Sequence, residues 1–170
     1  EEDGVYTLEL GGSDIDGDPL AFEASVDGNG TASIDGSTLT VTPAANFNGE
    51  ISVFIQVTDE GGLSDTQTFV LTVTPVNDTP VIDIIDNQEM SEDTSLEVSL
   101  SASDIDGDDE LIFIAEGNEF INVEVLGNIL TITPIADYNG SAEILVTVSD
   151  GELSDSTTFT LTVNPVNDAP

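Results

Sequence analysis

Two short acidic runs contain the residues best suited to chemistry. Residues 14–18 and 104–108 both read Asp-Ile-Asp-Gly-Asp. In an extended segment alternate side chains point to the same side, so Asp104 and Asp106 would direct two carboxylates at one point. Carboxylates about 4 Å apart repel each other by roughly 4 kcal/mol near a protein surface. Such a pair must be solvated, protonated or neutralised, and calcium, which takes about six to eight oxygen ligands, is the cation it suits.

These runs do not follow the EF-hand calcium loop, which places Gly at position 6 and Glu at position 12. Here Gly17 and Gly107 fall at position 4, and position 12 is Ser25 in one run and Ala115 in the other. Each run is therefore an acidic turn at the end of a strand, and further calcium ligands must come from elsewhere in the fold.

The composition removes most other kinds of site. The 170 residues include 35 Asp or Glu and no Lys, Arg, His or Cys. Without basic side chains there is no surface for nucleic acid or for an anionic membrane. Without His and Cys there is no Ser-His-Asp or Cys-His nucleophile and no basis for tight zinc, copper or iron binding. The groups that remain are the oxygen atoms of carboxylates, amides, hydroxyls and backbone carbonyls, which are ligands for hard cations such as calcium. No apolar run is long enough to predict insertion into a membrane.

The sequence repeats itself with an offset of 90 or 91 residues. Pro-Val-Asn-Asp-Thr-Pro at residues 75–80 returns as Pro-Val-Asn-Asp-Ala-Pro at residues 165–170. Further matched segments are 2–3 with 92–93, 13–18 with 103–108, 48–49 with 139–140, and 63–65 with 153–155. A period of this length indicates one small domain per repeat. We expect domain 1 at residues 1–78 and domain 2 at residues 79–170.

Apolar residues at every second position predict strands in both repeats. Residues 51–57, 96–102 and 142–148 show this spacing, and Gly, Asn and Asp separate the runs. The pattern is typical of an antiparallel sandwich. We expect an all-β chain of two tandem antiparallel Greek-key β-sandwich domains without helices. Seven strands fit repeat 2, the first at residues 81–85. Repeat 1 lacks this first strand, which we expect to lie outside the sequence, the alternative being that another chain supplies it.

Several motifs resemble those of a known family. Glu92-Asp93, the acidic turn, Thr133-Pro134 followed by residues 137–140, and the closing Val-Asn-Asp-Ala-Pro all recur in repeat 1 with small changes. By these motifs the chain resembles the bacterial cadherin-like (Ig-like) tandem repeats of large secreted surface adhesins. The resemblance covers nearly the whole chain, twice over.

The resemblance implies calcium at the junction of successive domains. Glu2 would lie at the base of domain 1, Asn77 and Asp78 in the linker, and Asp104, Asp106 and Asp150 at the top of domain 2, with Asp108 as an added candidate. The equivalent residues Asp14, Asp16 and Asp59 would form a partial site on domain 1. Asn48 or Glu50 of the base loop are weaker candidates, and Glu92, Asn167 and Asp168 would serve a following domain.

The match to the cadherin pattern is incomplete, and turn chemistry is an alternative for each residue. Pro75 stands where cadherins have an acidic residue, and Thr79 replaces an Asn, which suggests one or two ions rather than three. Asp-Gly and Asn-Gly are ordinary turn formers. Asn77 and Asp78 could simply cap a bend before Pro80.

The leading functional hypothesis is mechanical. Calcium at the junction would stiffen the chain into an extender of a bacterial cell-surface adhesin, whose partners are neighbouring repeats of the same chain. The alternative is a calcium-dependent module that binds a surface glycan or a protein, with Phe54 or Tyr138 as exposed aromatic residues. Paired carboxylates can also hydrolyse glycosides, but the acidic pairs simply repeat with the domain, so we expect no enzyme activity. The expected location is secreted, at the bacterial cell surface.

Overall fold

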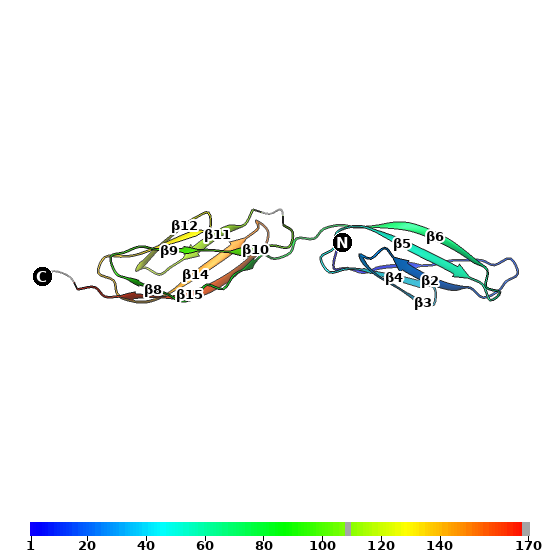
Figure 1. The fold of residues 1–170 in the computed structure, drawn as a ribbon, viewed down its shortest axis with the longest axis horizontal. Helices are drawn as coiled ribbons and strands as arrows, with labels where there is room; N and C mark the ends of the chain where they lie inside the picture. The colour runs from blue at the N-terminus through cyan, green and yellow to red at the C-terminus, as the bar shows by residue number, and fades with distance from the viewer. Residues whose placement is uncertain (108–109, 168–170) are drawn as a thin grey trace. The chain divides into compact units, whose positions relative to one another are not determined.

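The computed structural model describes residues 1–107 and 110–167, and within these residues it consists of strands, turns and loops (Figure 1). Asp108 and Asp168, two of the candidate ligands, lie outside the described residues. The chain divides into two compact units, Glu1–Val76 and Asn77–Pro170. This division falls two residues before the expected boundary, so Asn77 and Asp78 belong with unit 2. No described segment forms a helix of the length and apolarity needed to cross a membrane.

Unit 1 is a sandwich of two three-stranded antiparallel sheets. One sheet has the order β1-β4-β3 and the other β2-β5-β6. The strands are β1 (Tyr6–Glu9), β2 (Ala21–Val26), β3 (Gly30–Asp35), β4 (Thr38–Pro43), β5 (Gly49–Thr58) and β6 (Ser64–Val73). Since β1 corresponds by sequence to the second strand of the other repeat, unit 1 lacks a first strand, as predicted.

Unit 2 has the same sandwich with additional strands. Its sheets have the orders β11-β14-β15-β8, β12-β13-β9 and β10-β7, and only the β15–β8 pair is parallel among these described strands. The strands are β7 (Val81–Ile82), β8 (Gln88–Ser91), β9 (Leu96–Ser99), β10 (Ala102–Ser103), β11 (Ile112–Glu116), β12 (Ile121–Leu126), β13 (Ile129–Pro134), β14 (Gly140–Ser149) and β15 (Ser154–Asn164). The two tandem antiparallel sandwiches predicted from the sequence are confirmed.

The first strand of unit 2 differs from the expected single run at residues 81–85. Only Val81–Ile82 of that run form a strand, β7, and a second strand, β8, follows outside it and pairs with a different partner. Polar residues lie at the break: the Asn87 side chain accepts a hydrogen bond from the Thr160 backbone over 2.9 Å, and Gln88 donates to the Asp86 carbonyl over 2.9 Å. These side-chain bonds to backbone groups compete with a continuous ladder.

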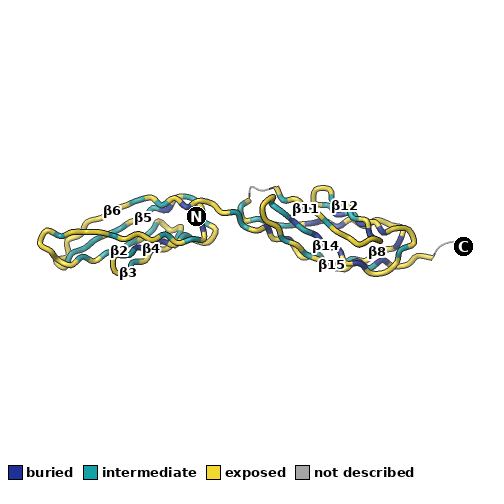
Figure 2. Tube along the Cα trace, turned by 180° about the vertical axis from the view of Figure 1, so that it is seen from behind, coloured by how far each residue is buried: buried dark blue, intermediate teal, exposed yellow. Residues whose placement is uncertain are grey.

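The core of each unit follows from the alternating pattern. In β14, the residues Ala142, Ile144, Val146 and Val148 are all buried, while the residues between them are exposed or half-buried (Figure 2). Among the residues that the structure describes, fourteen buried apolar residues form the core of unit 2 and five form that of unit 1. Because burial of apolar area is the main stabilising contribution to folding, we expect the hydrophobic core to stabilise unit 2 more than unit 1.

Candidate metal centre

Three segments that are distant in sequence meet at one end of unit 2. Asp104 follows β10, Asp150 follows β14, and Asn77–Asp78 precede β7. Since β7 pairs antiparallel with β10, the residues before β7 lie beside the residues after β10. The start of β11 is opposite the end of β14, with Ile112 paired to Ser149, which brings the turn after β14 to the same end.

Hydrogen bonds join the linker residues to both acidic turns. The backbone N–H of Asp78 donates to Oδ2 of Asp106 over 2.7 Å. The side-chain amide of Asn77 donates to Oδ2 of Asp150 over 3.0 Å and to the carbonyl of Asp78 over 3.2 Å. We call Asn77, Asp78, Asp104, Asp106 and Asp150 the linker cluster. The structure therefore brings these sequence-predicted residues together within unit 2.

The acidic run at residues 104–107 is a turn rather than an extended segment. The backbone N–H of Asp106 donates to Oδ1 of Asp104 over 3.1 Å, and Gly107 has a φ of 72°. The same-side geometry expected from extended backbone therefore does not hold. Asp104 binds the backbone of its own turn, whereas Asp106 binds the linker backbone.

Asp104 buries one of its carboxylate oxygens. Its Oδ2 is buried and accepts no hydrogen bond from the residues that the structure describes. Burying a charge without a partner costs several kcal/mol, and the chain has no Lys, Arg or His to supply one. This oxygen is therefore a candidate ligand for a bound cation.

The turn after β14 stabilises Asp150 as a carboxylate. Its Oδ1 accepts the backbone N–H groups of Leu153 and Glu152, each over 2.7 Å. These bonds, first that of Leu153 and then that of Glu152, with a smaller contribution from the Asn77 amide, lower the pKa of Asp150 below its ordinary value of 3.8. Asp150 is therefore negatively charged at neutral pH.

The donor set of the linker cluster fits a hard divalent cation. Carboxylate and amide oxygens are the ligands that calcium prefers, and the buried oxygen of Asp104 needs positive charge. Within residues 1–107 and 110–167, no group of three or more acidic side chains lies close enough together to hold a metal ion. Asp106 and Asp150 accept N–H groups in this arrangement. Asp104 and the other oxygen-bearing side chains of the linker cluster are the residues that would hold such an ion.

Comparison with known proteins identifies the family. A family model described as a bacterial Ig domain matches residues 1–72 and again residues 77–164. The chain belongs to the bacterial Ig domain family. The predicted likeness to bacterial cadherin-like, Ig-like repeats is thereby confirmed.

Individual proteins resemble this bacterial Ig pair over most of its length. Chitinase A of Pseudoalteromonas piscicida is 27% identical over an alignment of 171 positions, which covers 94% of this chain and 20% of the chitinase. The chain thus spans about a fifth of that relative. Among solved structures, human protocadherin-24 EC1-2 is 15% identical with a TM-score of 0.62, covering 95% of this chain and 88% of its own. Protocadherin gammaB7 EC3-6 is 22% identical with a TM-score of 0.51, covering 95% and 43%. These likenesses show the shared sandwich fold.

The first bacterial Ig domain repeats the acidic turns. The backbone N–H groups of Asp16 and Asp18 donate to Oδ1 of Asp14 over 2.8 and 3.3 Å, and that of Leu63 donates to Oδ1 of Asp59 over 2.8 Å. Asp14 and Asp59 line the same hollow of unit 1, while Asp16 is exposed. Asp14 and Asp59 therefore share a surface that Asp16 does not line.

The opposite end of each bacterial Ig domain carries a buried glutamate. Glu2 and Glu92 are only 4% and 3% exposed. Oε1 of Glu2 accepts the backbone N–H of Val76 over 2.7 Å, and Oε1 of Glu92 accepts that of Val166 over 2.6 Å. Oε2 of Glu92 also accepts the side-chain amide of Asn139 over 3.4 Å. Glu2, a predicted metal ligand, thus binds the backbone of the residue just before the linker cluster.

Sequence reasoning missed one polar contact that shapes unit 2. Oδ2 of Asp155 accepts the backbone N–H of Ile82 over 3.1 Å and so holds β7. The sequence signal for this contact is the Leu-Ser-Asp that occurs both at residues 63–65 and at residues 153–155.

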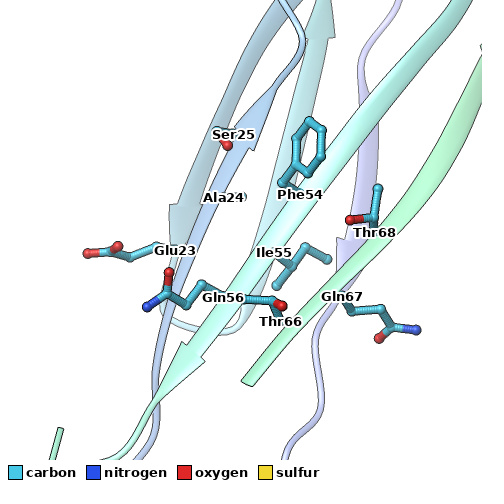
Figure 3. A pocket seen from close by; sticks show the side chains of 9 residues that line it. All are labelled: Glu23, Ala24, Ser25, Phe54, Ile55, Gln56, Thr66, Gln67 and Thr68. Carbon is cyan, nitrogen blue, oxygen red and sulfur yellow. The ribbon is translucent and has the colours of Figure 1, made fainter. Parts of the chain in front are cut away.

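A second candidate surface lies on the outer face of the β2-β5-β6 sheet. Phe54 is 45% exposed beside a shallow hollow of about 320 Å³, which Glu23, Gln56 and Gln67 also line (Figure 3). An aromatic ring offers apolar contact area, and amide and carboxylate groups can hydrogen-bond to hydroxyls. The combination is chemically suited to a sugar.

Proposed function

We propose that this chain is a calcium-stabilised structural module that extends a bacterial cell-surface adhesin. Calcium at the linker cluster rigidifies the chain where one repeat continues into the next. The observation that carries this proposal is the buried, unsatisfied Oδ2 of Asp104 in a chain that has no cationic side chain.

The linker backbone is the part of the chain that such an ion would restrain. Asn77 and Asp78 open unit 2 directly after Val76, the last residue of unit 1, and Val76 is itself bound by Glu2. Ordering one residue costs roughly 1–2 kcal/mol of backbone entropy. Calcium bonds to Asn77 and Asp78 would offset this cost. A direct contribution of Glu2, and a partial site at Asp14, Asp16 and Asp59, remain parts of the proposal that rest on the sequence resemblance.

Calorimetric titration of the chelator-treated chain with calcium tests the proposal directly. We expect heat of binding that Asp104→Asn abolishes or strongly weakens, since the substitution removes the central charge and keeps the shape. Asp35→Asn, at an exposed position in β3, is the matched control and should bind calcium normally.

A second measurement addresses rigidity. NMR relaxation of backbone amides reports how independently the two units tumble, and calcium should make their rotational correlation times converge. Correlation times that calcium leaves unchanged, despite saturable binding, would rule out the extender role and leave calcium as a stabiliser of unit 2 alone.

The proposed setting is outside the cell. The acidic, cysteine-free composition and the bacterial Ig family match support a secreted protein at the bacterial surface, with neighbouring repeats as partners. The proposed role is non-catalytic, because the acidic groups serve turns and the linker rather than a cleft between paired carboxylates.

The alternative function is calcium-dependent binding of a carbohydrate or a protein. The surface around Phe54 favours a carbohydrate, and the similarity to a protein named Chitinase A points to the same class of ligand. A glycan array followed by titration of chitin oligosaccharides tests it. Phe54→Ala should abolish binding, while Ile114→Ala, which removes an exposed side chain from β11 of unit 2, should not. If no glycan binds the unsubstituted chain, the hypothesis of carbohydrate binding is wrong.

A further inference from the structure

The triplet Asn-x-Ser/Thr, with any residue but Pro in the middle, occurs three times in the chain. It is found at residues 29–31, 77–79 and 139–141. This triplet is the acceptor sequence for N-linked glycosylation, in which a transferase attaches an oligosaccharide to the Asn side chain. Short motifs also arise by chance, so the surroundings of each Asn decide whether it can react. An acceptor must be exposed, and its amide must not be needed to hold the fold.

Two of the three Asn side chains serve the fold. Asn77 is half-buried, and its amide donates to Asp150 over 3.0 Å within the linker cluster. The amide of Asn139 donates over 3.4 Å to Oε2 of Glu92, a side chain that is only 3% exposed. A sugar on either amide would displace these contacts, because it would place a bulky hydrated group beside a carboxylate that the amide now binds.

Asn29 differs from both. It is exposed in the turn 27–29, which connects β2 with β3. Its backbone carbonyl accepts the N–H of Ala44 over 2.9 Å. Among the residues that the structure describes, none forms a hydrogen bond with the Asn29 side chain. The main chain is therefore held in place, and the amide is available for reaction.

The neighbours of Asn29 fix the turn without crowding the side chain. Oδ2 of Asp27 accepts the backbone N–H of Ser52 over 3.0 Å, which joins the turn to β5. Gly28 has a φ of 120°, and a Cβ at this position would meet nothing within 4 Å. A Cβ at Gly30 would come within 2.6 Å of a backbone carbonyl oxygen of β4. The turn is therefore open beside Gly28 and packed against the sheet at Gly30.

The hydroxyl that completes the triplet is accessible as well. Thr31 is exposed and lies in β3, an edge strand of the sheet β1-β4-β3. Only Gly30 separates it from Asn29, and a glycine places no side chain between the amide and the hydroxyl. Both groups that a transferase must reach are therefore exposed on one short segment.

The matched turn of unit 2 has a packing role instead. Gly30 and Ile121 hold the same register position, opposite Pro43 and Pro134, so Asn29 corresponds to Phe120. The ring of Phe120 stacks on that of Tyr138, with a centroid distance of 5.0 Å and an angle of 3° between the rings. Unit 1 has an exposed amide in place of this packing residue, so packing does not explain Asn29.

We propose that Asn29 is a site of N-linked glycosylation, whose substrate is an oligosaccharide carried on a polyprenyl pyrophosphate. Nδ2 of Asn29 forms a bond to C1 of the first sugar, while the bond from C1 to the pyrophosphate oxygen breaks and the pyrophosphate leaves with the electron pair. The proton lost by Nδ2 passes to a base of the transferase. The attached group is bulky and hydrated, and beside the edge strand β3 it hinders pairing with another chain.

The proposal rests on the proposed location outside the cell but not on calcium, and the test supplies both export and transferase. The full chain, behind a cleavable signal peptide, is exported to the periplasm of a host that contains a bacterial oligosaccharyltransferase and its polyprenyl-pyrophosphate-linked oligosaccharide. Because the chain has no Lys or Arg, a protease that cleaves after Glu replaces trypsin and releases residues 24–50 as one peptide. We expect mass spectrometry to find one oligosaccharide on this peptide, at Asn29.

Variants separate the triplet from exposure alone. Asn29→Gln and Thr31→Val should abolish the modification, whereas Thr31→Ser, which keeps the hydroxyl, should retain it. Asn48→Gln is the matched control and should leave the modification unchanged. Asn48 is also exposed and followed by Gly, but Glu50 stands where the hydroxyl is needed. The NMR spectrum of each variant shows that unit 1 is folded, so loss of the acceptor is not confused with loss of the fold.

Three outcomes would each overturn the proposal. These are an unmodified chain, an oligosaccharide on Asn77 or Asn139 with none on Asn29, and full modification of Thr31→Val. Calorimetric titration of the same purified chain with calcium is a separate readout. Failure of the glycosylation site is therefore distinguishable from failure of the proposed calcium role.

Discussion

Asn77 and Asp150 lie 73 residues apart in sequence, and their side chains share a hydrogen bond of 3.0 Å. One residue opens the linker, and the other begins the turn after β14. The bond joins the first residue of unit 2 to the turn that connects β14 with β15, its antiparallel partner. Linker chemistry and sandwich stability should therefore respond together when the linker cluster is changed.

Asp104→Asn should change stability in opposite directions with and without calcium. In chelator the variant should melt at or above the temperature of the unsubstituted chain, because it loses an unsatisfied buried charge and keeps the oxygen that binds Asp106. With calcium the order should reverse, since a ligand at about 100 times its Kd stabilises by about 2.7 kcal/mol. Scanning calorimetry in both conditions measures this. An equal loss of stability in both conditions would mean that Asp104 serves only its own turn.

The lowered pKa of Asp150 predicts a contribution to stability that depends on pH. A carboxyl group whose pKa is lowered by folding stabilises the fold above its unfolded pKa, and this contribution is lost as pH falls through the folded pKa. In chelator, the unsubstituted chain should therefore have a higher free energy of unfolding than Asp150→Asn near neutral pH. This difference should decrease as the pH falls below 3.8, the ordinary pKa of an Asp side chain. Urea denaturation at a series of pH values measures it. Glu152→Gln, which leaves the backbone N–H of residue 152 in place, should show no such dependence.

Each buried glutamate should stabilise its own unit. Glu92→Ala leaves the Val166 N–H without its acceptor and should destabilise unit 2 by about 1–3 kcal/mol. Glu2→Ala should do the same to unit 1 through Val76. A urea titration monitored by NMR measures the unfolding of each unit separately. In each variant the unsubstituted unit therefore serves as an internal control. Equal effects of one variant on both units would contradict the prediction.

Truncation of matched leucines should have unequal costs. Leu161 is fully buried, so Leu161→Ala should lower the free energy of unfolding of unit 2 by about 2–5 kcal/mol. Leu71 is only half-buried, so Leu71→Ala should lower that of unit 1 by less. Tyr6 and Tyr138 are the two tyrosines, one in each unit. If one of them is changed to Phe, the fluorescence of the remaining tyrosine reports the unfolding of its own unit alone. Equal costs would show that Leu71 is covered as well as Leu161 in solution.

The fold was predictable because the alternation of apolar residues is strong and occurs twice. The division between β7 and β8 was not, because the pairing of the chain around Asn87 with β15 depends on a bond to Thr160 that forms only in the folded sandwich. The local pattern of residues 81–85 carries no information about such a distant partner.

The residues of the linker cluster were predictable as a group, but not their geometry. Repeats and a family resemblance pointed to Asp104, Asp106 and Asp150. The extended conformation expected for Asp104 and Asp106 was incorrect, because an Asp side chain readily binds the backbone N–H two residues later and produces a turn. Burial of Glu2 was equally hidden, since its acceptor role requires Val76, 74 residues away.

The opposite placement of the buried glutamate and the acidic turns gives each repeat a direction. In both units the buried glutamate binds the backbone that follows the last strand, the acidic turns lie at the other end, and both features recur after 90 or 91 residues. A gene that gains or loses one whole repeat by recombination keeps the same pair of ends. Length can therefore evolve in steps of one sandwich, without any new contact having to arise by mutation.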